Sequence, residues 1–207
     1  MNTSSTLWIS FLLLSLFPVI TMSQTRINVA NKTKKVVVEK LAKDQIFSKD
    51  YCSNKDPLIQ LSVQRYCEAF NLLRVALKGD LSEVDVYCDS VAQLIQQVPK
   101  GAPFYDEWLC LKALNHVTRI RVDYYGRGLK YYLKAEECLD EALGLQPDNP
   151  TAFFLKGQNI RNLPSDFGGG MQPAEPYFQK CYDLFNDKEQ DVVIWSYGQV
   201  KKILSKE

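Results

Sequence analysis

Apolar side chains recur every three or four positions along most of this chain, which is the spacing of one face of an α-helix. The clearest case is the segment 57–78, where six residues define such a face: Ile59, Val63, Tyr66, Phe70, Leu73 and Leu77. Pro57 suits a first helical turn, and Gly79 suits a helix end. We therefore predict a helix over residues 57–78.

The same spacing predicts further helices, separated by turns that contain glycine or proline. They cover residues 36–47, 81–98, 103–122, 129–145, 151–162, 174–185 and 192–205. Residues 125–128 (YGRG) are expected to form a turn, and residues 163–172 a loop. The sequence predicts an all-α fold of stacked antiparallel helical hairpins, because helices with short connections pack against their chain neighbours.

The N-terminus has a different pattern. Residues 7–20 are an apolar run of 14 residues, and the first 25 residues carry no charged side chain. That run is shorter than the ~20 residues that span a bilayer. Small residues at Thr21 and Ser23 predict a signal peptide over residues 1–23, with Gln24 starting the mature chain. The alternative is an uncleaved membrane anchor, because no Lys or Arg precedes the run.

An exported chain is expected in the periplasm or outside the cell. Residues 24–35 are polar and predict a flexible lead-in, so the helical domain covers residues 36–207. Membrane contact is expected only if the apolar segment stays attached.

The six cysteines contain no CxxC pair, which argues against a zinc site or a redox pair. In an exported chain they suggest disulfides, and the alternative is buried thiols. The expected heights of the cysteines along antiparallel helices permit a Cys110–Cys138 disulfide, which we rank first. They also permit a Cys67–Cys88 disulfide. Cys181 is expected to be a buried thiol, and Cys52 has no evident partner.

Composition argues against several functions. The 25 basic and 24 acidic residues give a net charge of +1, which disfavours nucleic acid as a partner. The single histidine, His116, lies on an apolar helix stripe and is expected to be a packed, hydrogen-bonded core residue. Adjacent carboxylates such as Glu136 and Glu137 point to different sides of a helix and do not form an acid–base pair. We therefore expect no metal site, no cofactor and no catalysis.

Two segments repeat one pattern of small and large residues. Ala135, Leu139, Ala142 and Pro147 have spacings of 4, 3 and 5, and the first two spacings recur in Ala174, Phe178 and Cys181. Leu155 and Gly157 fit a partner helix that is approached closely. The pattern resembles the second helix, closing turn and first helix of tetratricopeptide repeats.

The segment after residue 163 is more distinctive. It carries Pro164, Phe167, Gly168, Gly169, Ala174 and Phe178. Over about residues 105–185, the chain resembles tetratricopeptide-like proteins of Bacteroidetes envelopes and the periplasmic T-component of tripartite (TRAP) transporters. The resemblance implies a binding or adaptor protein whose first helices line a groove, or alternatively an accessory periplasmic component of a TRAP-type solute transporter.

The glycine run 168–170 has two interpretations. Its backbone N–H groups could cradle an anion at a helix N-terminus. We favour a structural role, in which positive φ angles reverse the chain and Phe167 plugs the hairpin interior.

A cluster of tyrosines and arginines is the candidate ligand site. Its members are Arg119, Tyr124, Tyr125, Arg127 and, from a later helix, Arg161, with Arg121, Tyr131 and Tyr132 close by in sequence. Such a cluster could bind a carboxylate or a glycan, and the alternative is packing between helices with extended arginines. The expected partner is a protein, a peptide or a small molecule.

Overall fold

The computed structural model describes residues 46–47, 53–187 and 195–205. The predicted signal peptide, the lead-in, most of the helix over 36–47 and Cys52 lie outside these residues. No helix within the described ranges is long and apolar enough to cross a membrane.

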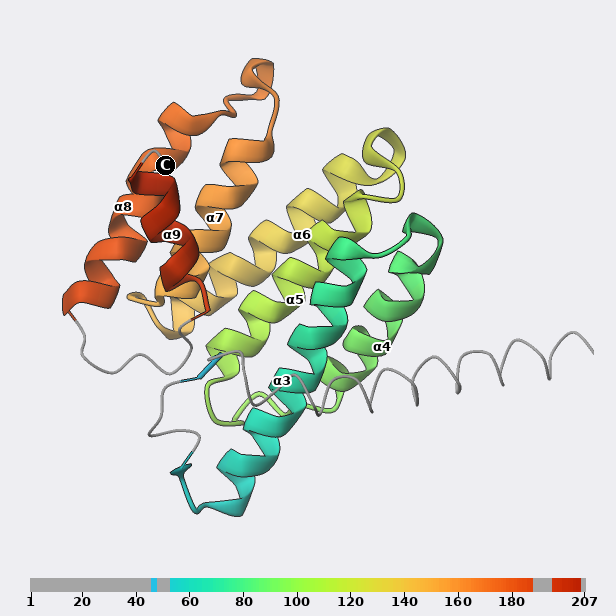
Figure 1. The fold of residues 1–207 in the computed structure, drawn as a ribbon, viewed down its shortest axis with the longest axis vertical. Helices are drawn as coiled ribbons and strands as arrows, with labels where there is room; N and C mark the ends of the chain where they lie inside the picture. Colours follow the sequence, from blue (N-terminus) through green and yellow to red (C-terminus); the bar gives the residue numbers. More distant parts are fainter. Residues whose placement is uncertain (1–45, 48–52, 188–194, 206–207) are drawn as a thin grey trace, which may run out of the picture.

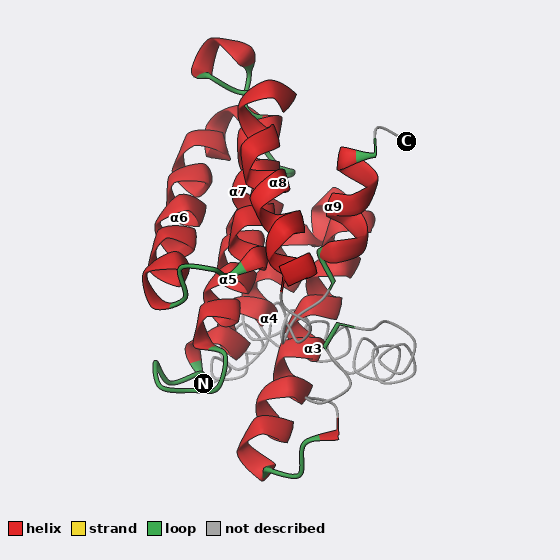
Figure 2. Cartoon of the chain, turned by 90° about the vertical axis from the view of Figure 1, so that its left-hand side faces the viewer, coloured by secondary structure: helices red, strands yellow, loops and turns green. Residues whose placement is uncertain are grey.

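The described elements confirm the all-α prediction (Figure 1). The helices are α3 (Pro57–Lys78), α4 (Val84–Gln96), α5 (Tyr105–Ile120), α6 (Tyr124–Leu145), α7 (Pro150–Asn162), α8 (Met171–Asp187) and α9 (Tyr197–Leu204). Two short 3-10 turns, η1 (Leu81–Glu83) and η2 (Ser165–Phe167), precede α4 and α8. Figure 2 shows the α7–α8 hairpin rising beside α5 and α6, with α9 against α8.

The helices pair in chain order. The three hairpins are α3–α4, α5–α6 and α7–α8. The helices α5 and α7 also contact both helices of the preceding hairpin. Residues far apart in sequence therefore meet mainly along α5, which touches α3, α4, α6 and α7.

Two hydrophobic clusters meet on α5. Trp108 and Leu111 belong to the cluster with α3 and α4, whereas Leu109, Cys110 and Ala113 belong to the cluster with α6 to α9. All five side chains are buried. Because successive α5 residues face opposite clusters, this helix has almost no exposed face and forms the centre of the domain.

The first turn of α6 corrects one prediction. Residues 125–128 are helical, and α6 begins at Tyr124. The Asp123 carboxylate caps the helix by accepting a hydrogen bond from the Gly126 N–H at 2.9 Å. A Cβ at Gly126 would overlap that carboxylate. The glycine that suggested a turn is therefore part of an N-cap.

The repeated residues are buried as predicted. Ala135, Leu139, Ala174, Phe178 and Cys181 are each 0% exposed. Small residues thus stand where α6 and α8 approach their neighbours closely.

The α7–α8 loop corrects another prediction. Phe167 is 78% exposed and does not plug the hairpin. Gly168 and Gly170 have φ angles of 76° and 117°, which confirms the predicted positive φ. The N–H groups of residues 168–170 all donate to backbone carbonyls, namely those of Ser165, Pro164 and Ile160. The loop is closed by its own hydrogen bonds, so an anion cradle is not supported.

The ranked disulfides are absent among the described cysteines. Cys110 directs its sulfur to the Asn149 side chain (3.8 Å), and Cys88 directs its sulfur to the Asn115 carbonyl (3.8 Å). All four cysteines of the two expected bridges, including Cys138 and Cys67, are free thiols, so both predictions are wrong. Cys181 is buried, as predicted.

We expect these buried thiols to resist alkylation in the native protein. Burial raises the pKa of Cys88 to about 12 and also raises the pKa of Cys110 and Cys138, so little thiolate forms. Alkylation at pH 8 with and without denaturant, followed by peptide mapping, measures this. Modification of Cys88 without denaturant, or a Cys110–Cys138 bridge, would contradict the structure.

Candidate functional site

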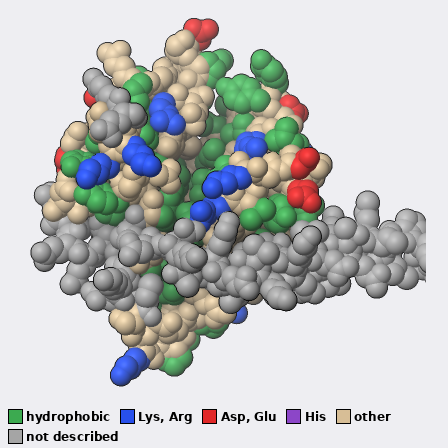
Figure 3. Space-filling model, in the orientation of Figure 1, with side chains coloured by type: hydrophobic (Ala, Val, Ile, Leu, Met, Phe, Trp, Pro, Cys, Tyr) green, Lys and Arg blue, Asp and Glu red, His purple; other side chains and the backbone are tan. Residues whose placement is uncertain are grey.

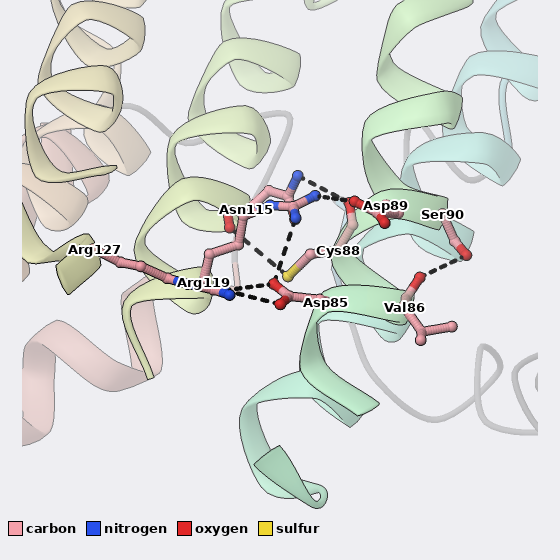
Figure 4. Close-up of polar contacts among 8 residues, drawn as sticks. All are labelled: Asp85, Val86, Cys88, Asp89, Ser90, Asn115, Arg119 and Arg127. Atoms are coloured by element: carbon pink, nitrogen blue, oxygen red, sulfur yellow. Dashed lines mark hydrogen bonds and ion pairs between the residues drawn. The ribbon is translucent and has the colours of Figure 1, made fainter. Parts of the chain in front are cut away.

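Two of the predicted site arginines are tied into a network between α4, α5 and α6 (Figure 4). The Arg119 guanidinium lies 2.8 Å from Asp89 and 3.5 Å from Asp85. Arg127 pairs with the same Asp85 at 2.8 Å. Burial lowers the pKa of Arg119, but its bond to Asp89 and nearby charges outweigh burial and raise it. The two positive charges are matched by two carboxylates, so this site holds helices together.

The other members of the candidate cluster are not brought into one site. Arg121 donates to the Ala76 carbonyl at the end of α3. Tyr124 and Tyr125 are 51% and 97% exposed at the start of α6. Arg161 lies on α7, with its guanidinium 6.0 Å from the centre of the Phe178 ring. The alternative interpretation, packing between helices, is the better one for the arginines.

His116 is packed, as predicted, but its Nδ1 atom is not hydrogen-bonded. The imidazole is half-buried between α5 and α6 and stacks on Tyr131, with ring centres 5.8 Å apart. Its Nδ1 atom is buried without a hydrogen-bond partner. Burial lowers the pKa of His116 to about 4, and Lys134, Lys112 and Arg119 contribute in the same direction. The imidazole is therefore neutral at pH 7.

This shift predicts a loss of stability in mild acid. The unfolded imidazole has a pKa near ~6.5, so between pH 6.5 and 4 the unfolded state binds more protons than the folded state. Stability should fall as the pH drops through that window. His116→Phe should remove this part of the dependence. Because the chain has one histidine, its NMR titration is unambiguous, and a midpoint above pH 6 in the folded protein would refute the burial argument.

Part of the face formed by the first helices is covered by Trp195. The Trp195 ring lies 5.1 Å from Phe70 of α3 and 5.6 Å from Phe154 of α7, measured between ring centres. It thus bridges two helices across α5. A residue of the chain itself therefore occupies part of the face on which the groove is expected.

A second surface opens where α6 and α7 separate. Along their contact, Lys156 of α7 lies 2.8 Å from both Glu136 and Asp140 of α6, and Asn159 donates to Glu136 at 2.7 Å. Burial lowers the pKa of Lys156, but its bonds to Asp140 and Glu136 outweigh burial and raise it. These contacts close one end, and beyond them the two helices diverge (Figure 1).

The α6 wall of this opening is apolar and aromatic. Tyr125, Leu129 and Tyr132 lie on the same helix face as Glu136, at spacings of four, three and four residues. Leu129 is 74% exposed, and the neighbouring Leu133 is 51% exposed. Burial raises the pKa of Tyr132, and the Glu136 carboxylate adds to the shift, so the phenol is neutral.

The opposite wall comes from the α7–α8 hairpin. Tyr177 lies close enough to Tyr132 to affect its pKa. At the tip of the hairpin, Phe167 and Met171 are 78% and 39% exposed. Figure 3 shows the surface hollowed between this hairpin and the rest of the molecule, with hydrophobic side chains in the hollow. We call this opening the α6–α7 cleft.

Comparison with solved structures finds a similar fold. The fold is similar to that of the HusA haemophore from Porphyromonas gingivalis, with a TM-score of 0.64. The two chains are 23% identical, and the match covers 84% of this chain and 91% of the other. No family model and no curated protein matches this chain. At this identity, the match establishes the shared all-α fold.

Of the predicted site residues, only Tyr125 lies on the cleft. Tyr132 was noted beside the candidate cluster, whereas Leu129 and Phe167 were not singled out from the sequence as site residues. The sequence did contain an indication of this exposed face. Positions 125, 129 and 133 are apolar and four residues apart, and the segment was expected to be partly a turn. An apolar stripe in such a segment has no evident packing partner.

Proposed function

We propose that this protein binds a flat, largely apolar small molecule of the tetrapyrrole class, such as haem, in the α6–α7 cleft. The observation that carries the proposal is the uncovered face of α6, where Tyr125, Leu129 and Leu133 remain exposed. An apolar face of this kind marks a binding site. The similarity in fold to a haemophore supports this class of ligand.

The cleft suits a flat ring better than a compact polar ligand. Tyrosine and leucine side chains offer stacking and apolar contact on one wall, and Phe167 and Tyr177 offer aromatic contact on the other. Each leucine that a ligand covers contributes about 1.5–3 kcal/mol. The neutral phenol of Tyr132 can donate a hydrogen bond to a ring substituent.

Few atoms of the cleft are of the kinds that can bind haem iron. His116 lies between α5 and α6 rather than in the cleft, and the five described cysteines are buried. Tyrosine oxygens and the Met171 thioether are the cleft atoms of the kinds that bind haem iron. Most of the free energy of binding would therefore come from burying the apolar surface of the tetrapyrrole ring.

We further propose binding without catalysis, by an exported protein. Glu136 and Asp140, the carboxylates nearest the cleft, are engaged by Lys156. Export rests on the predicted signal peptide over residues 1–23 and accords with the haemophore fold.

The stacked hairpins support the tetratricopeptide-like interpretation, but a peptide adaptor would need an open first-helix face. Because Trp195 covers part of that face, we place the ligand in the cleft instead. An accessory role in a TRAP-type transporter would require an interface with other transporter components.

Haem titration followed by absorbance tests the proposal. The wild-type chain should bind one haem with a shifted Soret band. Leu129→Glu puts a charge into the apolar wall and should weaken binding about tenfold or more. The matched control is Leu145→Glu on the same helix, where a leucine that is 56% exposed lies far from the cleft, and it should bind as the wild type does.

Two outcomes would count against the proposal. Absence of a saturable spectral change with haem would remove the ligand class. Equal affinity of the Leu129→Glu and Leu145→Glu variants would remove the cleft as the site.

A further inference from the structure

The tips of the three helical hairpins lie on one side of the molecule, from the top to the right-hand side of Figure 1. More than half of the exposed large apolar side chains in the described part of the chain stand on these tips or next to them. They are Leu77, Leu81, Tyr124, Tyr125, Phe167 and Met171. Exposed apolar side chains that gather in this way mark an interaction surface. We call the side formed by these six residues the tip face.

Two contacts hold the α3–α4 tip beside the α5–α6 tip. Arg121, just after α5, donates a hydrogen bond to the Ala76 carbonyl near the end of α3. Arg127, in the first turns of α6, pairs with Asp85 at the start of α4 at 2.8 Å. The apolar side chains of these two tips therefore belong to one surface.

The exposed side chains stand on separate protrusions. Leu81 is 49% exposed on the first tip, and Phe167 is 78% exposed on the third, across the α6–α7 cleft. Between them, Tyr124 and Tyr125 are 51% and 97% exposed, with ring centres 5.5 Å apart. A folded protein partner would need a matching recess for each protrusion, because protein interfaces are closely complementary in shape. A lipid bilayer is deformable and can receive each tip independently.

The residue types suit the boundary between lipid headgroups and acyl chains. Tyrosine has an apolar ring and a polar hydroxyl, and it is enriched at this depth in membrane proteins. Leucine and phenylalanine side chains bury apolar area in the same boundary when a protein lies on a membrane without crossing it. Leu81, Tyr124 and Phe167 supply one such side chain from each tip.

The charges of the tips indicate which lipids they fit. Residues 77–83, 121–125 and 163–171 contain four acidic and two basic side chains, a net charge of −2. Hydrogen bonds from Ser82 lower the pKa of Asp80, so this exposed carboxylate beside Leu81 stays ionised. An anionic lipid surface attracts basic segments and repels acidic ones. The tip face therefore fits a neutral, zwitterionic bilayer better than an anionic one.

We propose that the tip face docks on the surface of a zwitterionic lipid bilayer, with Leu81, Tyr124 and Phe167 entering the headgroup region. This contact needs no anchoring segment, and it does not depend on what the α6–α7 cleft binds. The cleft opens between the second and third tips (Figure 1). Docking therefore places the mouth of the cleft against the bilayer, the phase in which flat apolar molecules dissolve.

Co-sedimentation with phosphatidylcholine vesicles tests the proposal. The chain starting at Gln24 is used, so that the apolar run of residues 7–20 cannot itself insert. The wild type should bind these vesicles and should bind phosphatidylglycerol vesicles less tightly. Leu81→Glu should weaken binding to phosphatidylcholine about tenfold or more. The matched control is Leu145→Glu, which changes a leucine that is 56% exposed at the opposite end of α6, and it should bind as the wild type does.

Haem affinity separates this proposal from that for the cleft. Leu81 lies outside the cleft, so Leu81→Glu should lose vesicle binding and keep the haem affinity of the wild type. A wild type that does not bind phosphatidylcholine vesicles, or that binds only phosphatidylglycerol, would overturn the proposal. Equal vesicle binding by Leu81→Glu and Leu145→Glu would do the same. Self-association without lipid that Leu81→Glu abolishes would also overturn it, because the tip face would then belong to a second copy of the chain.

Discussion

Replacing Gly157 with valine is expected to destabilise the fold by about 3 kcal/mol or more. A Cβ at this position would lie 2.7 Å from Cε1 and 2.8 Å from Cδ1 of Phe178. That ring is 0% exposed and has its centre 6.0 Å from that of Phe154, so it has no free space into which to move. The α7–α8 hairpin would have to open at its closest approach.

Urea unfolding followed by circular dichroism measures this effect. The control is Gly128→Val in α6, where a Cβ meets nothing within 4 Å, and it should change the free energy of unfolding by less than about 1 kcal/mol. Adding Phe178→Leu to Gly157→Val should restore part of the loss, because the smaller side chain makes room. Equal effects of the two glycine substitutions would show that helix propensity dominates over the close packing.

Replacing Trp195 with alanine is expected to cost about 3 kcal/mol. The indole contacts Phe70 of one hydrophobic cluster and Phe154 of the other. Its loss leaves a gap on both sides and uncovers the first-helix face. The matched substitution is Tyr125→Ala, which removes an aromatic ring that is 97% exposed and should be nearly neutral in stability.

Chemical denaturation of both variants gives the comparison. A Trp195→Ala variant as stable as Tyr125→Ala would mean that the end of the chain does not pack where the structure places it. Haem affinity of Trp195→Ala should stay at the wild-type level, because Trp195 lies outside the cleft.

The helices could be predicted from the sequence because their signal is local. The three-and-four spacing over residues 57–78 gave the bounds of α3, and the buried small residues of α6 and α8 followed from the repeat. The start of α6 was wrong because Gly126 was interpreted through its turn preference. Its function depends on the side chain of Asp123, three residues earlier.

The site was harder to predict because it depends on partners distant in sequence. Arg119 and Arg127 could be either ligand contacts or packing residues, and only the position of α4 shows that Asp85 and Asp89 lie against them. The two disulfide predictions failed for a similar reason: helix height follows from residue counting, but rotation about the axis depends on packing. Leu129 was predicted to start a helix but lies in the second turn of α6, and its exposure becomes evident only once α7 diverges.

The position of Trp195 also affects the order in which the chain can fold. This residue completes a core begun by α3, more than a hundred positions earlier. During synthesis, the surfaces of Phe70 in α3 and Phe154 in α7 that Trp195 contacts therefore stay uncovered until residue 195 has been made. Domains generally fold as units, so a contact that is made late in synthesis delays completion of the core. For a chain expected to cross a membrane before it folds, such a late closing contact would keep it in a form that can be exported.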